Sequence, residues 1–600
     1  MKTEIVNFIN DLPAEVHSYN LSLEEGLYIF VDLHENGNLI GLEKEVYQKS
    51  KKEGEINKFL KNCLDIQTNI KPVSPQKIFN PNKKIFNASC SPFAICFKKK
   101  ILEKNIIIGT NIIKEIGQYF NAASKYTTNE IHIKRLEKFR KFCLENLLNI
   151  LTTLEEYKNL KSDFGINVFL KSVELSDYHT VYEKYLVNNV FNKEEYSKEI
   201  GRIVYGIADS LSSFNDKKMF LKHKTAPFEF NYRLTREDAK SIWQFFQLRN
   251  RVLPNPLPIF IDKRELNGKV IAILKEDSKI RFSEIIKNLF NNQENNKDLG
   301  NYYLLFFQRG ELVDFDFVPV FKYELKDMSI VEIFPLGGKM ETKVKNIFGF
   351  ERDIANRIFN NQLITETKAG GIWLKYFGDL EYNPQYITDN TFNQLLKYRK
   401  AFYDYIYKSR RESIQDFMFH DIMIKGILDD IRVDEYKDRK HSREYSIKEK
   451  LNIWFSLFNY FNNNSKSNTD MVNKTETLLK RIKQIVESDN ESLQTDEEFA
   501  FASGQLIRYL LGQSEAGDRT HALLEPFLQK IEPNMYKLAI ARTFDMYKHA
   551  IVFYKGNTRY SFDIIMSQVM GFKPDTTNMK LLLPLILAGY FSETIFKKPE

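Results

Sequence analysis

The pattern of apolar residues along the chain changes near Thr391. Before this point, short apolar runs typical of strands are interspersed with helical stretches, whereas after it apolar residues recur almost only at helical spacing. Strands and helices that are segregated in this way are typical of an α+β protein. Glycine and proline number only 25 and 17 in 600 residues, below their usual fractions of about 7% and 5%, which favours regular structure. We therefore expect an α+β fold with a mixed N-terminal and central region and an all-helical C-terminal bundle.

Short runs of β-branched and aromatic residues predict the strands of the mixed region. Near the N-terminus the expected strands are 27–31, 39–40, 93–97 and 106–108. Asn36-Gly37 predicts a tight turn between the first two. Helical spacing begins near Glu130, and we expect helices to continue to about Phe214. A second block of strands is expected at 258–261, 302–307, 313–321 and 371–377, with a hairpin turn at Arg309-Gly310.

The clearest break in the chain is the segment from Asn462 to Asp470, NNNSKSNTD, which contains no apolar residue and predicts a linker. Together with the changes in pattern, it suggests four parts. These are an N-terminal α/β domain, a strand-rich central domain, a basic helical region and a C-terminal helical bundle, at 1–225, 226–390, 391–470 and 471–600.

Helix signals in the C-terminal bundle are regular. Thr495 and Glu498 fit a capping box that opens a helix, and Gly512 marks its end. Asn534 is expected to cap the next long helix, whose apolar stripe includes Tyr536 and Ile540. The bundle is therefore expected to form a self-contained helical piece.

Membrane-spanning and disulfide-rich proteins are excluded by the sequence. The longest apolar run, Leu581 to Phe591, is shorter than the ~20 residues that cross a membrane, and Pro584 interrupts it. No secretory signal is visible at the N-terminus.

The cysteines form no CxxC pair and no zinc quartet, so we expect buried thiols in a reduced, cytoplasmic protein. They are Cys63, Cys90, Cys96 and Cys143.

Few residues suggest catalysis. His420-Asp421 is the one match to a metal-dependent phosphohydrolase dyad, but such a site needs further His and Asp ligands that no spacing in the sequence supplies. Gly337-Gly338-Lys339 lacks the spacing of a phosphate-binding P-loop. We therefore expect no enzyme, no catalytic residue, and neither a metal nor another cofactor. A metal-dependent nuclease that uses His420 and Asp421 is the alternative.

The charge of the chain is positive and unevenly distributed. It has 87 Lys and Arg against 79 Asp and Glu, a net charge of +8, and 471–600 contains 16 of each sign. The whole excess therefore lies within 1–470. A positive excess suits a polyanionic partner, although the high content of Lys, Asn and Ile is also what an AT-rich genome favours.

The segment 397–411, KYRKAFYDYIYKSRR, interleaves cations with aromatic residues. At helical spacing Tyr398, Phe402, Tyr405 and Ile406 line one side, and Lys397, Lys400, Lys408 and Arg411 line another. We expect a helix that packs on a core and presents cations to nucleic-acid phosphates, and an ordinary solvated amphipathic helix is the alternative. The cations are Lys397, Arg399, Lys400, Lys408, Arg410 and Arg411.

Other basic and glycine-rich positions are weaker candidates for nucleic-acid contacts. One set flanks a short strand and could clamp a backbone: Lys83, Lys84, Asn87, Lys98, Lys99 and Lys100. Glycine pairs could allow close approach to a phosphate: Gly337 and Gly338 beside Lys339, and Gly370 with Gly371. Arg508 and Arg542 are candidates in the bundle. Solvated loop lysines and simple turns are the alternatives.

Three stretches of the chain together resemble a known family. They are NASCSPFAICFKKK at 87–100, NYYLLFFQRGELVDFDFVPVFKY at 301–323 and FAFASGQLIRYLLGQSEAGDRTHALLEPFLQK at 499–530. Their order and spacing are similar to the Csh-type large subunit of type I-B CRISPR interference (Cascade) complexes. The similarity extends along nearly the full chain, because its length, mixed N-terminal part and helical C-terminal bundle also match.

The resemblance implies a non-catalytic, RNA-guided DNA-binding subunit for antiviral defence. Such a subunit recognises the protospacer-adjacent motif, promotes R-loop formation and recruits a separate helicase–nuclease, while pairing with the guide supplies most of the sequence specificity. The implied partners are crRNA, target double-stranded DNA, Cascade backbone and handle-binding subunits, the helicase–nuclease, and a small subunit. Met471, directly after the linker, is the position from which internal translation would supply the small subunit, and an ordinary internal methionine is the alternative. Some relatives carry a zinc-binding cysteine quartet, which this chain lacks. A stand-alone nucleic-acid-binding scaffold is a second alternative.

Overall fold

The α+β fold is confirmed by a computed structural model. It describes residues 1–600 except 14–15, 18, 50–55, 75–76, 80–85, 87–88, 110, 192–195, 209–232, 250, 277–279, 292–298, 327, 338–341, 367–371, 435–442, 463–469, 489, 515–519, 552–556 and 597–600. The chain divides into two compact units, Met1–Ile280 and Arg281–Glu600, where the sequence suggested four parts. No helix in the described ranges is long and apolar enough to cross a membrane.

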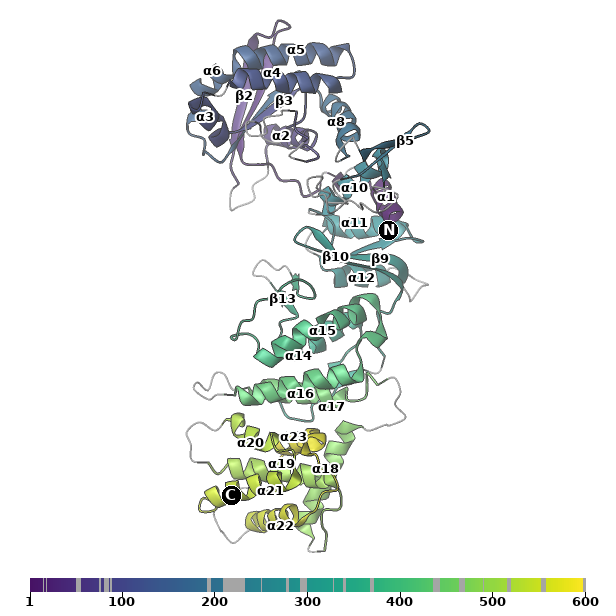
Figure 1. Cartoon of the computed structure of the whole chain (residues 1–600), viewed down its shortest axis with the longest axis vertical. Helices are drawn as coiled ribbons and strands as arrows, with labels where there is room; N and C mark the ends of the chain where they lie inside the picture. Colours follow the sequence, from purple (N-terminus) through teal and green to yellow (C-terminus); the bar gives the residue numbers. More distant parts are fainter. Residues whose placement is uncertain are drawn as a thin grey trace, which may run out of the picture. The chain divides into compact units, whose positions relative to one another are not determined.

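A four-stranded sheet forms the centre of the first unit (Figure 1). In spatial order its strands are β2 (Leu39–Tyr47), β1 (Gly26–Leu33), β4 (Gly165–Leu170) and β3 (Ala94–Lys98). β1 runs parallel to β4 and antiparallel to β2, and β3 is antiparallel to β4. The expected turn between β1 and β2 is confirmed: Gly37 adopts a φ of 87°, which residues with a side chain rarely adopt.

Helices pack against this sheet. α4 (Ile112–Ala123) and α5 (Glu130–Glu145) lie side by side (Figure 1), and Phe120 and Phe139 join the strand residues in one core. The other elements of the unit are α1 (Lys2–Asp11), α2 (Lys58–Thr68), α3 (Lys99–Ile107), α6 (Leu147–Thr153), α7 (Glu155–Lys158), α8 (Leu175–Asn189), β5 (Lys198–Ile200), β6 (Ile203–Gly206), β7 (Leu234–Thr235), α10 (Arg236–Arg249), β8 (Leu257–Phe260) and α11 (Glu265–Glu276).

Two expectations for the first unit are wrong. The isoleucine run 106–108 is the end of α3 and the turn after it, not a strand, and its side chains are exposed. The helical stretch expected from Glu130 to Phe214 is interrupted by β4, all six residues of which are buried, and again by β5 and β6. Its last part, 209–214, lies outside the described residues. A strand that is buried on both faces shows no polar alternation, so its sequence resembles that of a buried helix.

The second unit begins with α12 (Phe282–Asn291) and a hairpin of β9 (Leu299–Gln308) and β10 (Glu311–Phe321). Arg309 and Gly310 form the turn with φ values of 49° and 93°, which confirms the expected hairpin. The short elements that follow are β11 (Ser329–Ile330), β12 (Thr342–Lys343), α13 (Ile347–Phe350), the π-helical turn Glu351–Ala355, α14 (Asn356–Ile358), β13 (Ile364–Glu366) and β14 (Ile372–Leu374).

From Asp389 onward the described elements are all helical, as the sequence predicts. They are α15 (Asp389–Lys408), α16 (Asp416–Arg432), α17 (Glu444–Ser456), α18 (Met471–Glu487), α19 (Asp496–Leu511), α20 (Glu525–Leu528), α21 (Pro533–Tyr547), α22 (Asn557–Gly571) and α23 (Leu583–Phe591), with shorter turns between some of them. Of the predicted linker, 463–469 lies outside the described residues.

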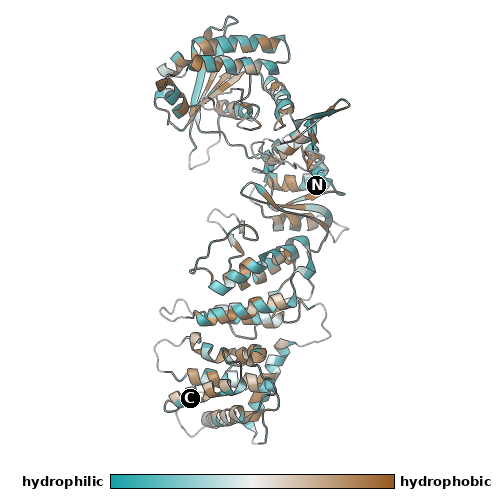
Figure 2. Cartoon of the chain, in the orientation of Figure 1, coloured by the Kyte–Doolittle hydropathy of each residue, from teal (hydrophilic) through white to brown (hydrophobic). Residues whose placement is uncertain are grey.

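α19 and α23 form the tightest helix pair of the bundle, and α23 is almost wholly apolar (Figure 2). Gly504 of α19 faces the backbone of Ile586, and Gly589 of α23 faces the backbone of Phe501. At either glycine an added Cβ would overlap a carbonyl oxygen of the other helix. The two glycines therefore set how closely the helices approach.

The predicted helix caps of the bundle are confirmed in one case and wrong in the other. Thr495 caps α19, since its side-chain oxygen accepts a hydrogen bond of 3.1 Å from the backbone N–H of Glu498. The Glu498 carboxylate accepts from the backbone N–H of Gln494 at 2.7 Å, one residue before the position that a capping box uses. Asn534 does not cap α21, because that helix already begins at Pro533. Proline suits the first helical position, where its fixed φ is helical and its missing N–H would have no partner within the helix.

Candidate nucleic-acid interface

The basic-aromatic segment 397–411 lies on α15 and on the turn that follows it. The helix ends where Ser409 adopts a left-handed conformation, with a φ of 55°. Tyr398, Phe402, Tyr405 and Ile406 are buried, as the helical spacing predicts, and Tyr403 and Tyr407 are buried as well. The predicted helix is therefore confirmed, but its cations do not all face solvent.

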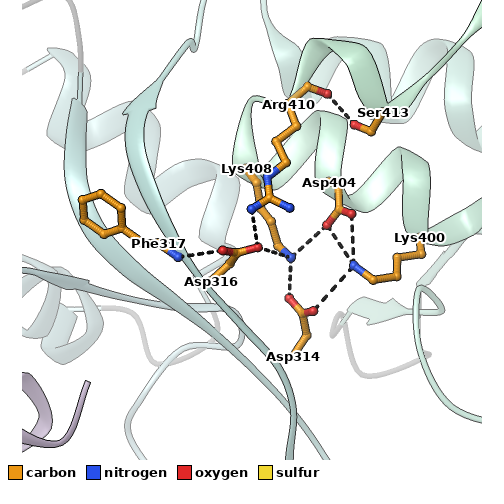
Figure 3. Close-up of polar contacts among 8 residues, drawn as sticks. All are labelled: Asp314, Asp316, Phe317, Lys400, Asp404, Lys408, Arg410 and Ser413. Atoms are coloured by element: carbon orange, nitrogen blue, oxygen red, sulfur yellow. Dashed lines mark hydrogen bonds and ion pairs between the residues drawn. The ribbon is translucent and has the colours of Figure 1, made fainter.

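Lys408, in the last turn of α15, is surrounded by carboxylates (Figure 3). Its ammonium nitrogen lies 2.7 Å from Asp314 Oδ2, 2.8 Å from Asp404 Oδ1 and 3.2 Å from Asp316 Oδ2, and its side chain is 2% exposed. Asp314 and Asp316 reach the same lysine because alternate side chains of strand β10 point to one face. Burial opposes the charge, but hydrogen bonds to Asp314 and Asp404 outweigh it and raise the pKa of Lys408.

Two further cations of the segment share these carboxylates. Lys400 lies 3.0 Å from Asp404 and 3.7 Å from Asp314, and Arg410 lies 2.7 Å from Asp316. The lysine–aspartate cluster thus sets Lys400, Lys408 and Arg410 against Asp314, Asp316 and Asp404. Its charges balance and it joins α15 to β10. A phosphate would have to displace a carboxylate to reach these cations.

The remaining cations of the segment have different environments. Arg399 donates hydrogen bonds to the backbone carbonyls of Lys375, at 3.1 Å, and Gly378, at 2.6 Å. These bonds stabilise the loop after β14. Lys397 is 59% exposed and lies 3.7 Å from Asp421. Arg411 is exposed and forms no ion pair with a residue that the structure describes. Lys397 and Arg411 are therefore the cations of this segment that an external phosphate can best reach.

The lysines around β3 divide in the same way. Lys98 and Lys100 are exposed. Lys99 is 6% exposed, and its ammonium donates hydrogen bonds to the carbonyls of Tyr157 and Leu160 at 2.7 and 2.8 Å, which fixes the chain before β4. Lys83, Lys84 and Asn87 lie outside the described residues.

The other predicted positions fall in the second unit. Gly337 lies in an exposed turn with a φ of 87° and open space where a Cβ would stand. Arg508 donates a hydrogen bond to the carbonyl of Ser592, and Arg542 is exposed on α21. Outside the described residues lie Gly338, Lys339, Gly370 and Gly371.

His420 and Asp421 interact with different partners. Trp454 Nε1 donates to His420 Nδ1 at 2.7 Å, whereas Asp421 accepts from the Tyr398 hydroxyl at 2.9 Å and pairs with Lys425 at 2.7 Å. Burial lowers the pKa of His420. Within the described ranges, no group of three or more His, Cys, Asp or Glu side chains is arranged to hold a metal ion. These contacts explain the dyad as part of the packing around α16.

The four cysteines are buried, as predicted. Burial raises the pKa of Cys63 and of Cys96 to about 12. These thiols therefore stay protonated at neutral pH, and they act as small apolar side chains.

Sequence reasoning missed a buried carboxyl group, Glu351. It begins the π-helical turn and is 6% exposed. The Tyr376 hydroxyl donates to its Oε1 at 2.6 Å, but burial has the larger effect and raises the pKa of Glu351 to about 7. In the sequence the residue stands in a charged stretch, FERD, that is typical of an exposed helix, so no local signal marks it.

Sequence reasoning also missed a cavity of about 430 Å³ in the second unit. Its lining includes Arg309 of the β9–β10 turn, Gln362 before β13, Trp373 of β14 and Phe392 of α15. The segment after β14 adds polar and aromatic residues: Lys375, Asp379, Glu381, Tyr382 and Asn383. Two predicted features contribute to its lining: the Arg309-Gly310 turn through Arg309, and the expected strand 371–377 through Trp373 and Lys375.

A scan against protein-family models matches no family, and a search of the curated proteins finds no significant match.

Proposed function

We propose that this chain is the non-catalytic large subunit of a type I-B CRISPR surveillance complex (Cascade), an RNA-guided antiviral assembly of the cytoplasm. In this role it recognises the protospacer-adjacent motif on target DNA, promotes R-loop formation and recruits a helicase–nuclease. The observation that carries the proposal is the ordered occurrence of the three stretches 87–100, 301–323 and 499–530, which are similar to this subunit.

The residues of these stretches contribute to packing within the elements that the stretches form. The second stretch is the β9–β10 hairpin, whose Asp314 and Asp316 hold α15. The third includes α19, whose Gly504 allows close contact with α23. The first includes β3, an edge strand of the first sheet. Residues of this kind specify packing, so a resemblance among them indicates a shared fold more than a shared ligand.

The distribution of charge supports a nucleic-acid partner. The net charge of +8 lies within 1–470, and the lysine–aspartate cluster contributes nothing to it because its charges balance. Exposed cations such as Lys98, Lys100, Lys397 and Arg411 are then available to attract phosphates.

The small subunit is proposed to arise by translation from Met471, the first residue of α18. Asp470 caps this helix, because its side chain accepts hydrogen bonds from the backbone N–H groups of Val472 and Asn473 at 3.0 and 3.1 Å. A product that starts at Met471 loses this cap, at a cost of about 1 kcal/mol, and keeps the packed helices. Mass spectrometry of the expressed native coding sequence should detect it, and Met471→Leu should abolish it. Assembled complexes that contain only the full-length chain would contradict internal translation.

Co-purification tests the proposed function. The tagged full-length chain is expressed together with Cascade backbone and handle-binding subunits and a crRNA, and the eluate is analysed for protein and RNA. We expect the partners and the crRNA to elute with the chain at a constant ratio, and omission of the crRNA to reduce their recovery. Elution of the chain alone, while the partners still assemble on crRNA, would favour a stand-alone scaffold. Metal-dependent DNA cleavage that is lost in His420→Ala would instead establish a nuclease.

A further inference from the structure

Trp373 differs from the other two tryptophans of the chain. Trp454 is 0% and Trp243 is 8% exposed, whereas Trp373 is 52% exposed. Tyr382 and Tyr386, on the loop that follows β14, are also exposed, at 44% and 59%. Exposed aromatic side chains that are close in the chain and rimmed by polar residues are typical of a binding surface, whereas single scattered ones are not.

Trp373 and Tyr382 line the cavity of about 430 Å³. This volume is within the range of pockets that hold a small organic ligand, and such pockets combine apolar walls with a few placed polar groups. Here the apolar lining includes Leu395, and the charged lining consists of two cations and two carboxylates: Arg309, Lys375, Asp379 and Glu381. This lining suits a ligand with a flat aromatic ring, hydrogen-bond donors on the edge of the ring, and a negatively charged group close to it.

The wall of the cavity is fixed before any ligand binds. Arg399 holds the carbonyls of Lys375 and Gly378. Gly378 has a φ of 74°, and the Gln308 side chain fills the space that a Cβ at this position would need. Gln308 also donates to the carbonyl of Phe377 at 3.3 Å. A wall that is already ordered lowers the entropic cost of binding, and Arg399 is thereby a positioning residue rather than a phosphate contact.

The cations of the cavity are not neutralised as those of the lysine–aspartate cluster are. Lys375 Nζ lies 5.6 Å from the centroid of the Trp373 ring and donates to Gln362 Oε1 at 2.9 Å. Arg309 is exposed at the hairpin turn. Among the residues described, neither cation forms an ion pair with a carboxylate. Both can therefore receive an anion without breaking an ion pair between described residues.

We propose that this cavity binds one unpaired nucleotide of a single-stranded nucleic acid, with its base stacked on Trp373 and its phosphate beside Arg309 and Lys375. Aromatic rings next to cations hold single strands in this way, because every base has a π-face and every linkage a charge. Asp379 and Glu381 can accept hydrogen bonds from the amino groups of a base. The choice of a nucleic acid over another aromatic anion rests on the proposed function, whereas the site rests on the cavity itself.

Binding of short labelled oligonucleotides to the purified full-length chain tests the site. Single-stranded DNA, single-stranded RNA and the duplex of the same sequence are compared by fluorescence anisotropy, and the strand that binds more tightly identifies the source of the nucleotide. Trp373→Ala should weaken binding of that strand roughly tenfold, the scale of one base–aromatic stack. Trp373→Phe should retain most of the affinity. Phe417→Ala, which removes a ring that is 59% exposed outside the cavity, is the matched control and should change nothing.

An abasic oligonucleotide separates stacking from attraction to phosphates. The wild-type chain should bind it about as weakly as Trp373→Ala binds the intact strand, and Trp373→Ala should show no further decrease. Equal affinity of wild type and Trp373→Ala, equal binding of duplex and single strands, or no affinity for either strand would overturn the proposal. Co-purification with crRNA-bound partners is independent of these results, so a failure of the site and a failure of the proposed function are distinguishable.

Discussion

Lys408 of α15 and Asp314 of β10 form an ion pair of 2.7 Å in which the lysine side chain is only 2% exposed. The pair brings into the interior a cation that the sequence predicts to contact phosphates. An ammonium taken out of water is tolerated only where close carboxylates compensate its lost hydration, and Asp404 and Asp316 complete that set. The basic segment 397–411 thus serves first to attach α15 to the β9–β10 hairpin.

Lys408→Met should lower the free energy of unfolding by about 3 kcal/mol, because it leaves the carboxylates around it uncompensated. Denaturant unfolding measures this loss. Lys397→Met removes an exposed cation, whose charge water screens, and should cost much less than Lys408→Met. Equal and small losses in both variants would mean that the cluster is solvated and that Lys408 is open to external anions.

The salt dependence of DNA binding should separate the exposed cations from the clustered ones. Lys397→Ala combined with Arg411→Ala should reduce the log–log salt slope on duplex DNA by roughly 0.9 for each phosphate that is no longer neutralised. Lys400→Ala combined with Arg410→Ala should change the slope less, because carboxylates already compensate these residues. A larger reduction of the slope in the Lys400→Ala, Arg410→Ala variant would instead show that the clustered cations contact phosphates.

Local signals in the sequence predict much of the fold. Three predictions depend on a few neighbouring residues each, and all are confirmed: the Arg309-Gly310 hairpin, the Thr495 cap, and the burial of Tyr398, Phe402 and Tyr405 on α15. β4 could not be recognised, because a strand covered on both faces loses the alternation that marks strands. The isoleucines 106–108 were predicted as a strand because β-branched residues favour strands. The preference of such a short run is weak, and its tertiary surroundings determine which structure it adopts.

The candidate site was less predictable, because it depends on contacts between distant segments. Lys408 could be recognised as buried only once Asp314, many residues earlier in the chain, was placed beside it. The same holds for Glu351, whose environment includes Tyr376, and for the cavity, in which Arg309 and Trp373 come from different strands and turns. Composition shows that cations are present, but it does not show which of them are already paired.

Glu351 predicts a pH dependence of stability. Burial raises its pKa from 4.5 to about 7, so between these values the folded chain holds a proton that the unfolded chain has lost. The stabilisation that comes from this raised pKa is therefore fully present below about pH 4.5. The free energy of unfolding falls by about 3 kcal/mol as the pH rises to about 7. Glu351→Gln stays neutral and should remove this dependence. The difference in unfolding free energy between variant and wild type should grow from about pH 5 to pH 7, and a constant difference would contradict the raised pKa.

Gly504→Ala should destabilise the bundle by about 1–3 kcal/mol, because the new methyl group would overlap the backbone of Ile586 and force α19 from α23. Gly571→Ala is the matched control, since a Cβ there meets open space, and it should be neutral or slightly stabilising. Thermal unfolding of the two full-length variants makes the comparison. Similar melting temperatures would show that α19 and α23 do not approach as closely as described.

Binding of DNA by the reconstituted complex, with and without this chain, tests the proposed function most directly. The Cascade backbone and handle-binding subunits are assembled on one crRNA and presented with target duplexes that differ only in the motif flanking the target. We predict that complexes containing the chain bind a small subset of the flanking motifs, and that complexes lacking it lose this selectivity together with most of their affinity for duplex DNA. Identical binding across all motifs whether or not the chain is present would contradict its role as the large subunit.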